Sequence, residues 1–153
     1  MDYLFVKWVH ILSSTILFGT GLGSAFYLFM AHRSKDTASI AFSARHVVIA
    51  DFLFTAPAVI VQFVNGMWLL HLTGFSFEDH WVAWAVTLYV FAGLCWLPVI
   101  WMQIRMRDMA KLALETASPL PDEYWLMARW WTILGSLAFP AVVAIFWLMV
   151  MKP

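Results

Sequence analysis

Four long stretches of this sequence contain no charged residue: 11–31, 52–70, 81–104 and 130–151. Each is close to the ~20 residues that a helix needs to cross the hydrocarbon core of a bilayer. A helix also satisfies its own backbone polar groups, which is required where no water is present. The pattern therefore predicts an all-α integral membrane protein, a four-helix up-down-up-down bundle. We place its helices at about residues 3–31, 46–72, 80–113 and 122–151.

The composition excludes a soluble globular protein. Hydrophobic residues make up 63% of the chain, charged residues make up 12%, and the mean hydropathy is +0.81. A soluble domain has about a quarter of its residues charged. The spans and their connections use nearly all of residues 1–153, so we expect a single transmembrane domain whose main partner is the lipid bilayer. The formal net charge of zero predicts no nucleic-acid partner.

The distribution of Lys and Arg predicts the orientation in the membrane. The first and third connections contain Arg33, Lys35, Arg45, Arg105, Arg107 and Lys111, whereas the second connection, residues 71–80, contains no Lys or Arg. Positively charged loops stay on the cytoplasmic side. We therefore expect the first and third connections in the cytoplasm and both termini outside, in the periplasm.

Polar residues recur at helical spacing on the first two predicted helices. On the first helix, Lys7, His10 and Ser14 share one face. On the second helix, the polar stripe consists of Asp51, Thr55, Gln62 and Asn65. Because polar side chains are costly in lipid, both faces should point into the bundle. Two interpretations stay open: the stripe forms hydrogen bonds between helices, or it lines a cavity, a cofactor site or a transport path. We expect Asp51 to pair with a basic group such as Arg45 or Arg105.

The histidines suggest one metal site. His10 lies on the inward face of the first helix, and His71 ends the second helix on the same outer side, whereas His32 and His80 are expected in loops. Two imidazoles from neighbouring helices are a common axial pair for haem iron in a helical bundle. His10 and His71 are therefore the candidate ligands of a b-type haem. The alternative is a pair of hydrogen-bonded histidines at the membrane interface.

Residues 7–14, 18–24, 44–51 and 96–108 resemble the bacterial predicted integral membrane proteins of domain-of-unknown-function family 2269. The similarity runs over the whole chain. It implies a multi-pass protein of the bacterial inner membrane, but that family has no settled activity.

A more limited similarity is to the bacterial membrane-bound, haem-containing protoporphyrinogen oxidase. That enzyme has the pattern aromatic-x-Lys-x-x-His in its first helix, which Phe5, Lys7 and His10 match, and residues 55–58 and 66–70 are similar to its second helix. The match implies that His10 is the haem ligand. The enzyme also has a functional lysine near the start of its third helix, and residues 81–85 contain none here. The similarity therefore favours haem binding without protoporphyrinogen oxidation.

Three hypotheses of function follow. The first is a b-type haem protein, a membrane oxidoreductase if it is an enzyme, that passes electrons between the membrane and a membrane or periplasmic redox partner. The second is a small transporter whose path is lined by Asp51, Gln62 and Asn65. The third is a noncatalytic subunit or assembly factor of a larger membrane complex. Monomeric and oligomeric states are both compatible with the sequence.

We predict that a reporter fused to either terminus responds as periplasmic, and that a reporter inserted between Arg33 and Arg45 responds as cytoplasmic. The cause is the concentration of Lys and Arg in the first and third connections. Alkaline phosphatase and fluorescent-protein fusions measure this directly. A C-terminus found in the cytoplasm would contradict the predicted orientation.

Overall fold

The computed structural model describes residues 2–153, and every regular element in that range is a helix. The elements are α1 (Tyr3–Ser34), α2 (Thr37–Ala50), the short π-helix η1 (Asp51–Thr55), α3 (Ala56–Thr73), α4 (His80–Glu115) and α5 (Asp122–Met151). Because α2, η1 and α3 follow one another without a break, they form one rod over Thr37–Thr73. The structure thus has four helices long and apolar enough to cross a membrane, which confirms the predicted all-α, four-helix membrane fold.

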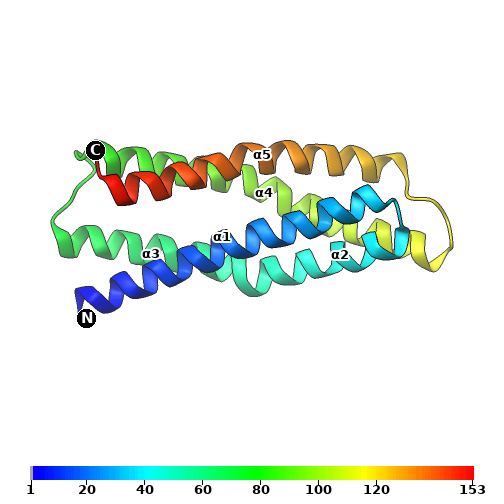
Figure 1. The fold of residues 1–153 in the computed structure, drawn as a ribbon, viewed down its shortest axis with the longest axis horizontal. Helices are drawn as coiled ribbons and strands as arrows, with labels where there is room; N and C mark the ends of the chain where they lie inside the picture. Colours follow the sequence, from blue (N-terminus) through cyan, green and yellow to red (C-terminus); the bar gives the residue numbers. More distant parts are fainter. Residues whose placement is uncertain (1) are drawn as a thin grey trace.

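The four rods lie along one long axis (Figure 1). Both chain ends and the α3–α4 connection lie at one end of the molecule, and the α1–α2 and α4–α5 connections lie at the other. We call the first the open end and the second the closed end, because helix packing differs between them as described below. The side of the membrane that each end faces stays a prediction.

The second rod begins at Thr37, well before the start predicted near residue 46. Asp36 caps this helix: its Oδ2 accepts hydrogen bonds from the Ser39 backbone nitrogen at 2.8 Å and from the Ser39 hydroxyl at 2.6 Å. These two bonds hold the pKa of the Asp36 carboxyl below its usual value. Lys35 turns the chain in the left-handed region, with φ of 55°. The connection expected to be a loop is therefore mostly helix, because an Asp side chain at this position satisfies the free N–H groups of a helix start.

A dense apolar core fills the closed end. α2 packs against both α1 and α4, and α4 packs along α5. The buried residues of this core are Leu28, Ala31, Ile40, Ala44, Val47, Val99, Met102, Met106, Ala110, Tyr124, Ala128 and Trp131. Small alanines alternate here with large side chains, which allows the helices to approach closely.

The sequence pattern predicts that His32 lies in a loop, but in the structure it is helical and packs beside this core. It lies in the last turn of α1, and its Nε2 is 2.7 Å from the hydroxyl of Tyr124 on α5. The rings of Tyr124, Trp125 and Trp131 surround it with centroid distances of 5.6 to 5.9 Å. His80 likewise lies outside a loop, as the first residue of α4. His32 therefore links the first and last rods at the closed end.

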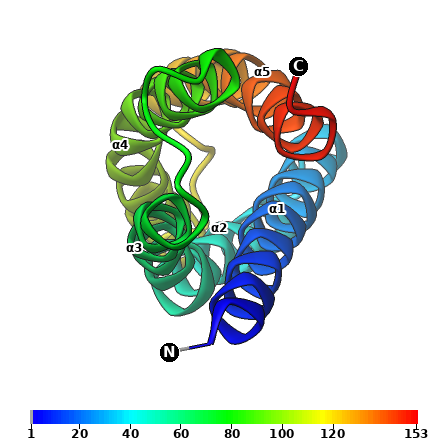
Figure 2. The same ribbon diagram turned by 90° about the vertical axis from the view of Figure 1, so that its left-hand side faces the viewer.

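The open end is packed more loosely. There α1 packs on α3 and α4 on α5, but no comparable packing joins α1 to α5 or α3 to α4. A small core of Trp81, Val82, Ala85 and Leu148 covers the contact between α4 and α5. Seen along the long axis, the helices surround a central space at this end (Figure 2). The bundle thus consists of two helix pairs, α1 with α3 and α4 with α5, which are held together at the closed end.

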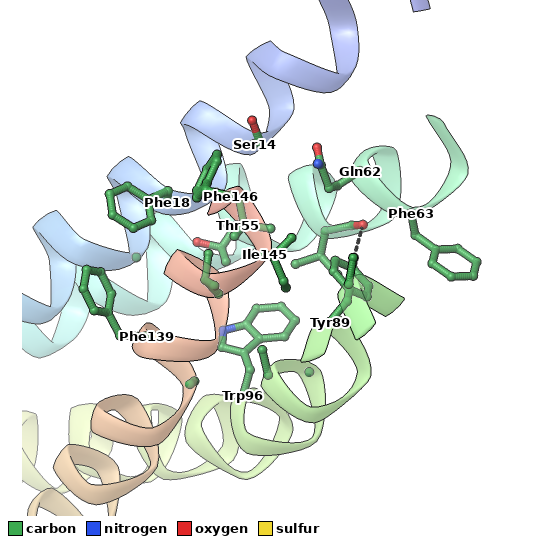
Figure 3. A pocket seen from close by; sticks show the side chains of 18 of the residues that line it. Ser14, Phe18, Thr55, Gln62, Phe63, Tyr89, Trp96, Phe139, Ile145 and Phe146 are labelled. Atoms are coloured by element: carbon green, nitrogen blue, oxygen red, sulfur yellow. Dashed lines mark hydrogen bonds between the residues drawn. The ribbon is translucent and has the colours of Figure 1, made fainter. Parts of the chain in front are cut away.

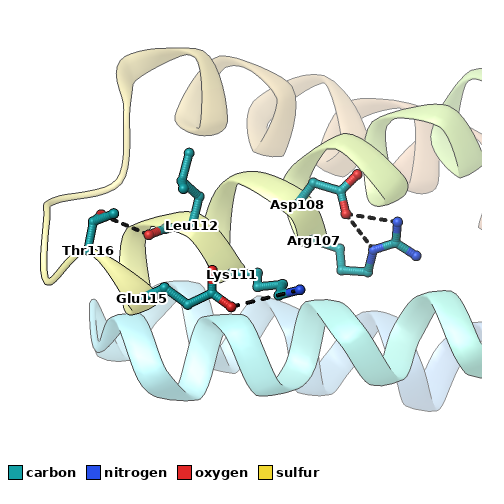
Figure 4. Close-up of polar contacts among 6 residues, drawn as sticks. All are labelled: Arg107, Asp108, Lys111, Leu112, Glu115 and Thr116. Atoms are coloured by element: carbon teal, nitrogen blue, oxygen red, sulfur yellow. Dashed lines mark hydrogen bonds and ion pairs between the residues drawn. The ribbon is translucent and has the colours of Figure 1, made fainter.

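Large apolar side chains cover the outside of the bundle, as lipid contact requires. Tyr27, Leu94 and Val150 are between 64% and 78% exposed. An apolar surface of this extent marks contact with a membrane. Beyond its apolar stretch, α4 carries charged and polar contacts at the closed end (Figure 4): Arg107 with Asp108 at 2.8 Å, Lys111 with Glu115 at 3.8 Å, and Thr116 with the carbonyl of Leu112 at 2.8 Å.

We predict that Tyr124→Phe lowers the free energy of unfolding by about 1 to 2 kcal/mol, because it leaves the half-buried His32 without its partner. The fully buried Tyr124 ring itself is retained. Thermal unfolding of the purified protein in detergent measures the effect. Tyr27→Phe is the matched control, since Tyr27 is 70% exposed and should change stability by less than about 0.5 kcal/mol. Equal effects of the two variants would show that the bond to His32 is unimportant.

Candidate binding cleft

A cleft of about 1140 Å³ lies between the two helix pairs. It runs from the open end, where Lys7 and Lys152 line it, to Trp131 of the closed-end core. Its walls are mainly apolar and aromatic, and Figure 3 shows side chains of α1, α3, α4 and α5 around one shared space. The aromatic lining residues labelled there are Phe18, Phe63, Tyr89, Trp96, Phe139 and Phe146.

Side chains bridge the cleft where the helices do not pack. Phe18 of α1 stacks on Phe139 of α5, with centroids 5.2 Å apart, and meets Phe146 edge to face at 5.4 Å. On the opposite side, the hydroxyl of Tyr89 donates a 2.7 Å hydrogen bond to the carbonyl of Val59 (Figure 3). These ring contacts join α1 to α5 at a level where the two helices make no extensive contact of their own.

The π-helix η1 lies in the middle of the second rod, between α2, which packs on both α1 and α4, and α3, which packs on α1. The backbone nitrogen of Ala56 donates to the carbonyl of Asp51, which is the i+5 bond of a π-turn. Pro57 follows directly, and proline has no N–H to donate to the preceding turn. A π-turn contains one more residue than an α-turn, so it rotates the following helix by about 100°. Beyond this turn the packing on α4 that α2 makes is not continued by α3, whereas the contact with α1 is kept.

His10 is held at the edge of the cleft by a network that joins α1 to α3. The amide nitrogen of Gln62 donates to His10 Nε2 at 2.9 Å, and Ser13 donates to the amide oxygen of Gln62. Gly66 lies directly against the imidazole, since a Cβ placed on this glycine would be 3.4 Å from His10 Cε1. The ring proton is then on Nδ1, and this buried nitrogen has no hydrogen-bond partner among residues 2–153.

A second polar cluster surrounds Asp51, deeper in the cleft. The hydroxyl of Thr55 donates to Asp51 Oδ1 at 2.9 Å, and Gln103 and Trp96 of α4 lie beside the same carboxyl group. Asp51 is 4% exposed and Gln103 is 5% exposed. The four side chains all line the cleft.

The predicted pairing of Asp51 with Arg45 or Arg105 is wrong. Arg105 pairs with Glu123 of α5 at 3.3 Å, and Arg45 is exposed. Asp51 points inward because it continues the buried face of α2, on which Ala44, Val47 and Val48 lie, whereas both arginines are exposed. The carboxyl group therefore has a hydroxyl as its partner and no basic side chain in the described part of the chain.

Of the remaining predicted site residues, one lines the cleft and two do not. Ser14 lines the cleft, with its hydroxyl bonded to the carbonyl of Ile11 at 2.7 Å. Asn65 is half-buried and His71 is exposed, and neither lines the cleft. At 100° per residue, the lining residues of α3 span about 160° centred on Val59, and Asn65 and His71 lie about 120° to either side. The structure therefore does not bring His71 into the cleft with His10.

Sequence reasoning missed Gln103, Trp96 and Tyr89. Gln103 carried a usable signal, because an amide within the uncharged stretch 81–104 is costly in lipid unless it faces inward. Trp96 and Tyr89 carried none, since aromatic residues are frequent throughout this chain.

Four apolar rods, a lipid-facing exterior and an internal cleft define a multi-pass integral membrane protein. A family model described as "Predicted integral membrane protein (DUF2269)" matches residues 4–153, and the chain belongs to this family. No curated protein and no solved structure matches the chain. The resemblance to family 2269 is thus confirmed, and the more limited similarity to the haem-containing oxidase finds no support in these comparisons.

We predict that Gln62→Leu destabilises the protein by about 1 kcal/mol, because it removes the amide that joins Ser13 to His10 across two helices. Asn65→Leu is the matched control: it lies on the same helix, outside the cleft, and makes no side-chain hydrogen bond in the described structure. Thermal unfolding in detergent compares the two variants. If both lose the same stability, the network around His10 does not hold α1 to α3.

Proposed function

We propose that this protein binds an amphipathic small molecule from the membrane in the cleft between its two helix pairs. The cleft itself carries the proposal, because about 1140 Å³ of space between the helix pairs is lined mainly by aromatic and aliphatic side chains. Ligand sites are concave and mainly apolar, with a few polar groups that fix orientation. The clusters around His10 and Asp51 are such groups.

A binding step of this kind is common to the transporter hypothesis and to a carrier or accessory subunit. The lining favours a ligand with an extended apolar body, because most lining side chains are aliphatic or aromatic. This arrangement does not favour the water-lined route that a small hydrophilic substrate needs.

We predict that filling the cleft abolishes binding of an apolar probe, dodecanol, to the protein in lipid nanodiscs. Gly93 of α4 lines the cleft, and no atom lies within 4 Å of a Cβ placed there, so that the side chain of Gly93→Phe begins in open space and occupies part of the cleft. Dodecanol affinity, measured by calorimetry against empty nanodiscs, should fall about tenfold or more, since lost apolar burial of about 1.4 kcal/mol has this effect.

Gly19→Phe is the control for this experiment. Gly19 of α1 is also free of neighbours within 4 Å, but it does not line the cleft. This variant should bind dodecanol as the wild type does. Equal affinities of wild type and Gly93→Phe would contradict the proposal.

Haem b is a second candidate occupant, favoured by the His10 imidazole on the cleft wall. His10 would hold the iron after the Gln62 amide releases Nε2, and the thioether of Met67, which also lines the cleft, would serve as a second ligand in place of His71. Lys7 and Lys152 at the open end have the charge that suits the haem propionates. A bound b-type haem would supply one-electron transfer to a redox partner.

We predict for this candidate that the purified protein, expressed with haem supplied, shows a Soret band and a sharp α band on reduction with dithionite. His10→Ala should remove or shift these bands, because it deletes the ligand. His80→Ala is the control, since His80 is exposed and does not line the cleft. A folded wild-type protein that never acquires the bands would exclude haem and leave the cleft for another amphipathic ligand.

A further inference from the structure

Asp51 is the single acidic residue among the described residues that line the cleft. It lies in η1, deep between the helix pairs and away from Lys7 and Lys152 at the open end. Thr55 holds one carboxyl oxygen, Oδ1, at 2.9 Å and so fixes the orientation of the group. The other oxygen remains free for a partner.

Two buried acceptor atoms in this cluster are unpaired. Within residues 2–153, Asp51 Oδ2 and Gln103 Oε1 have no hydrogen-bond partner, although both side chains are at least 95% buried. Gln103 and Trp96 lie beside the Asp51 carboxyl, so both unpaired oxygens belong to one small region. Unpaired buried acceptors cost stability, and they are found where a ligand supplies the missing donors.

The site also lacks a positive charge. A carboxylate inside a membrane bundle is normally paired with a basic group, and the ion pairs of this chain lie elsewhere, at the closed end. A ligand that carries both a positive charge and N–H donors would satisfy Asp51 and Gln103 together.

We propose that the cleft selects an amphiphile with a primary ammonium head, which binds at Asp51; this inference rests on the proposed function of the cleft. The N–H groups donate to Asp51 Oδ2 and Gln103 Oε1. The indole of Trp96, which lines the cleft (Figure 3), lies beside the same carboxyl group. The apolar tail lies along the aromatic wall formed by Phe18, Phe139 and Phe146.

The charges at the open end affect how a cationic head enters the cleft. Lys7 and Lys152 line the open end, where their ammonium groups repel a cationic head. The side between α1 and α5 carries no charged lining residue along its aromatic bridge. The charges therefore disfavour passage of a cationic head through the open end.

The test compares dodecylammonium with dodecanol, two probes with the same tail, on the full-length protein in phosphatidylcholine nanodiscs. Calorimetric titration, corrected with empty nanodiscs, should show dodecylammonium binding about tenfold or more tighter than dodecanol, because a hydrogen bond to a charged group has at least this effect. Asp51→Asn should bring the ratio of the two affinities close to one, because it removes the charge that distinguishes the two probes. Asp36→Asn, the same change at an exposed helix cap where Asn caps equally well, should keep the preference.

The outcomes separate this inference from the function on which it rests. Equal binding of both probes by the wild type would overturn the ammonium site while the cleft remains a binding site. A neutral Asp51 whose O–H donates a hydrogen bond to Gln103 Oε1 would give equal binding. A preference retained in Asp51→Asn would also overturn the ammonium site. Binding of neither probe would overturn both proposals. The comparison of the two probes on the wild type needs no variant, so it decides the question even where Asp51→Asn fails to fold.

Discussion

The contact of α2 with both α1 and α4 determines the shape of this protein. It is the one place where the two helix pairs share a dense apolar core, in which Leu28, Ile40 and Met106 are fully buried. In lipid, helices associate through close packing and hydrogen bonds and not through a hydrophobic driving force, so a region without such contacts is free to separate. The pairs are joined at the closed end and diverge at the open end, and the cleft is the space that results.

The π-helix η1 changes the direction in which the second rod faces. It rotates α3 relative to α2 by about 100°, and α3 does not continue the packing on α4 that α2 makes. The contact with α1 is kept along the whole rod. Asp51 and Thr55 of η1 line the cleft where the contact with α4 ends.

The two polar clusters differ in whether their hydrogen bonds join two helices. Around His10, the bonds from Gln62 and Ser13 join α1 to α3, so this network holds one helix pair together. Around Asp51, the bond from Thr55 stays within one turn. Both clusters contain a buried atom without a partner in the described structure: Nδ1 of His10 in the first, and Oδ2 of Asp51 and Oε1 of Gln103 in the second. The first cluster still joins two helices by hydrogen bonds, whereas the second leaves acceptors open beside an acidic group.

The sequence by itself determined the number, length and approximate position of the membrane helices, since lipid requires about 20 uncharged residues for each span and leaves few alternatives. It also indicated that Asp51, Thr55 and Gln62 face inward, because polar groups are costly in lipid. The start of the second rod at Thr37 was missed although Asp36 provides an N-cap signal. Which polar residues meet was decided only by the tertiary structure: Gln62 contacts His10, Gln103 lies beside Asp51, and Asn65 and His71 turn away. The physical reason is that the face of α3 that lines the cleft is only about 160° wide. A side chain about 120° from the centre of that face, such as Asn65 or His71, lies outside it. The rotation of about 100° at the π-turn therefore decides which residues of α3 reach a partner.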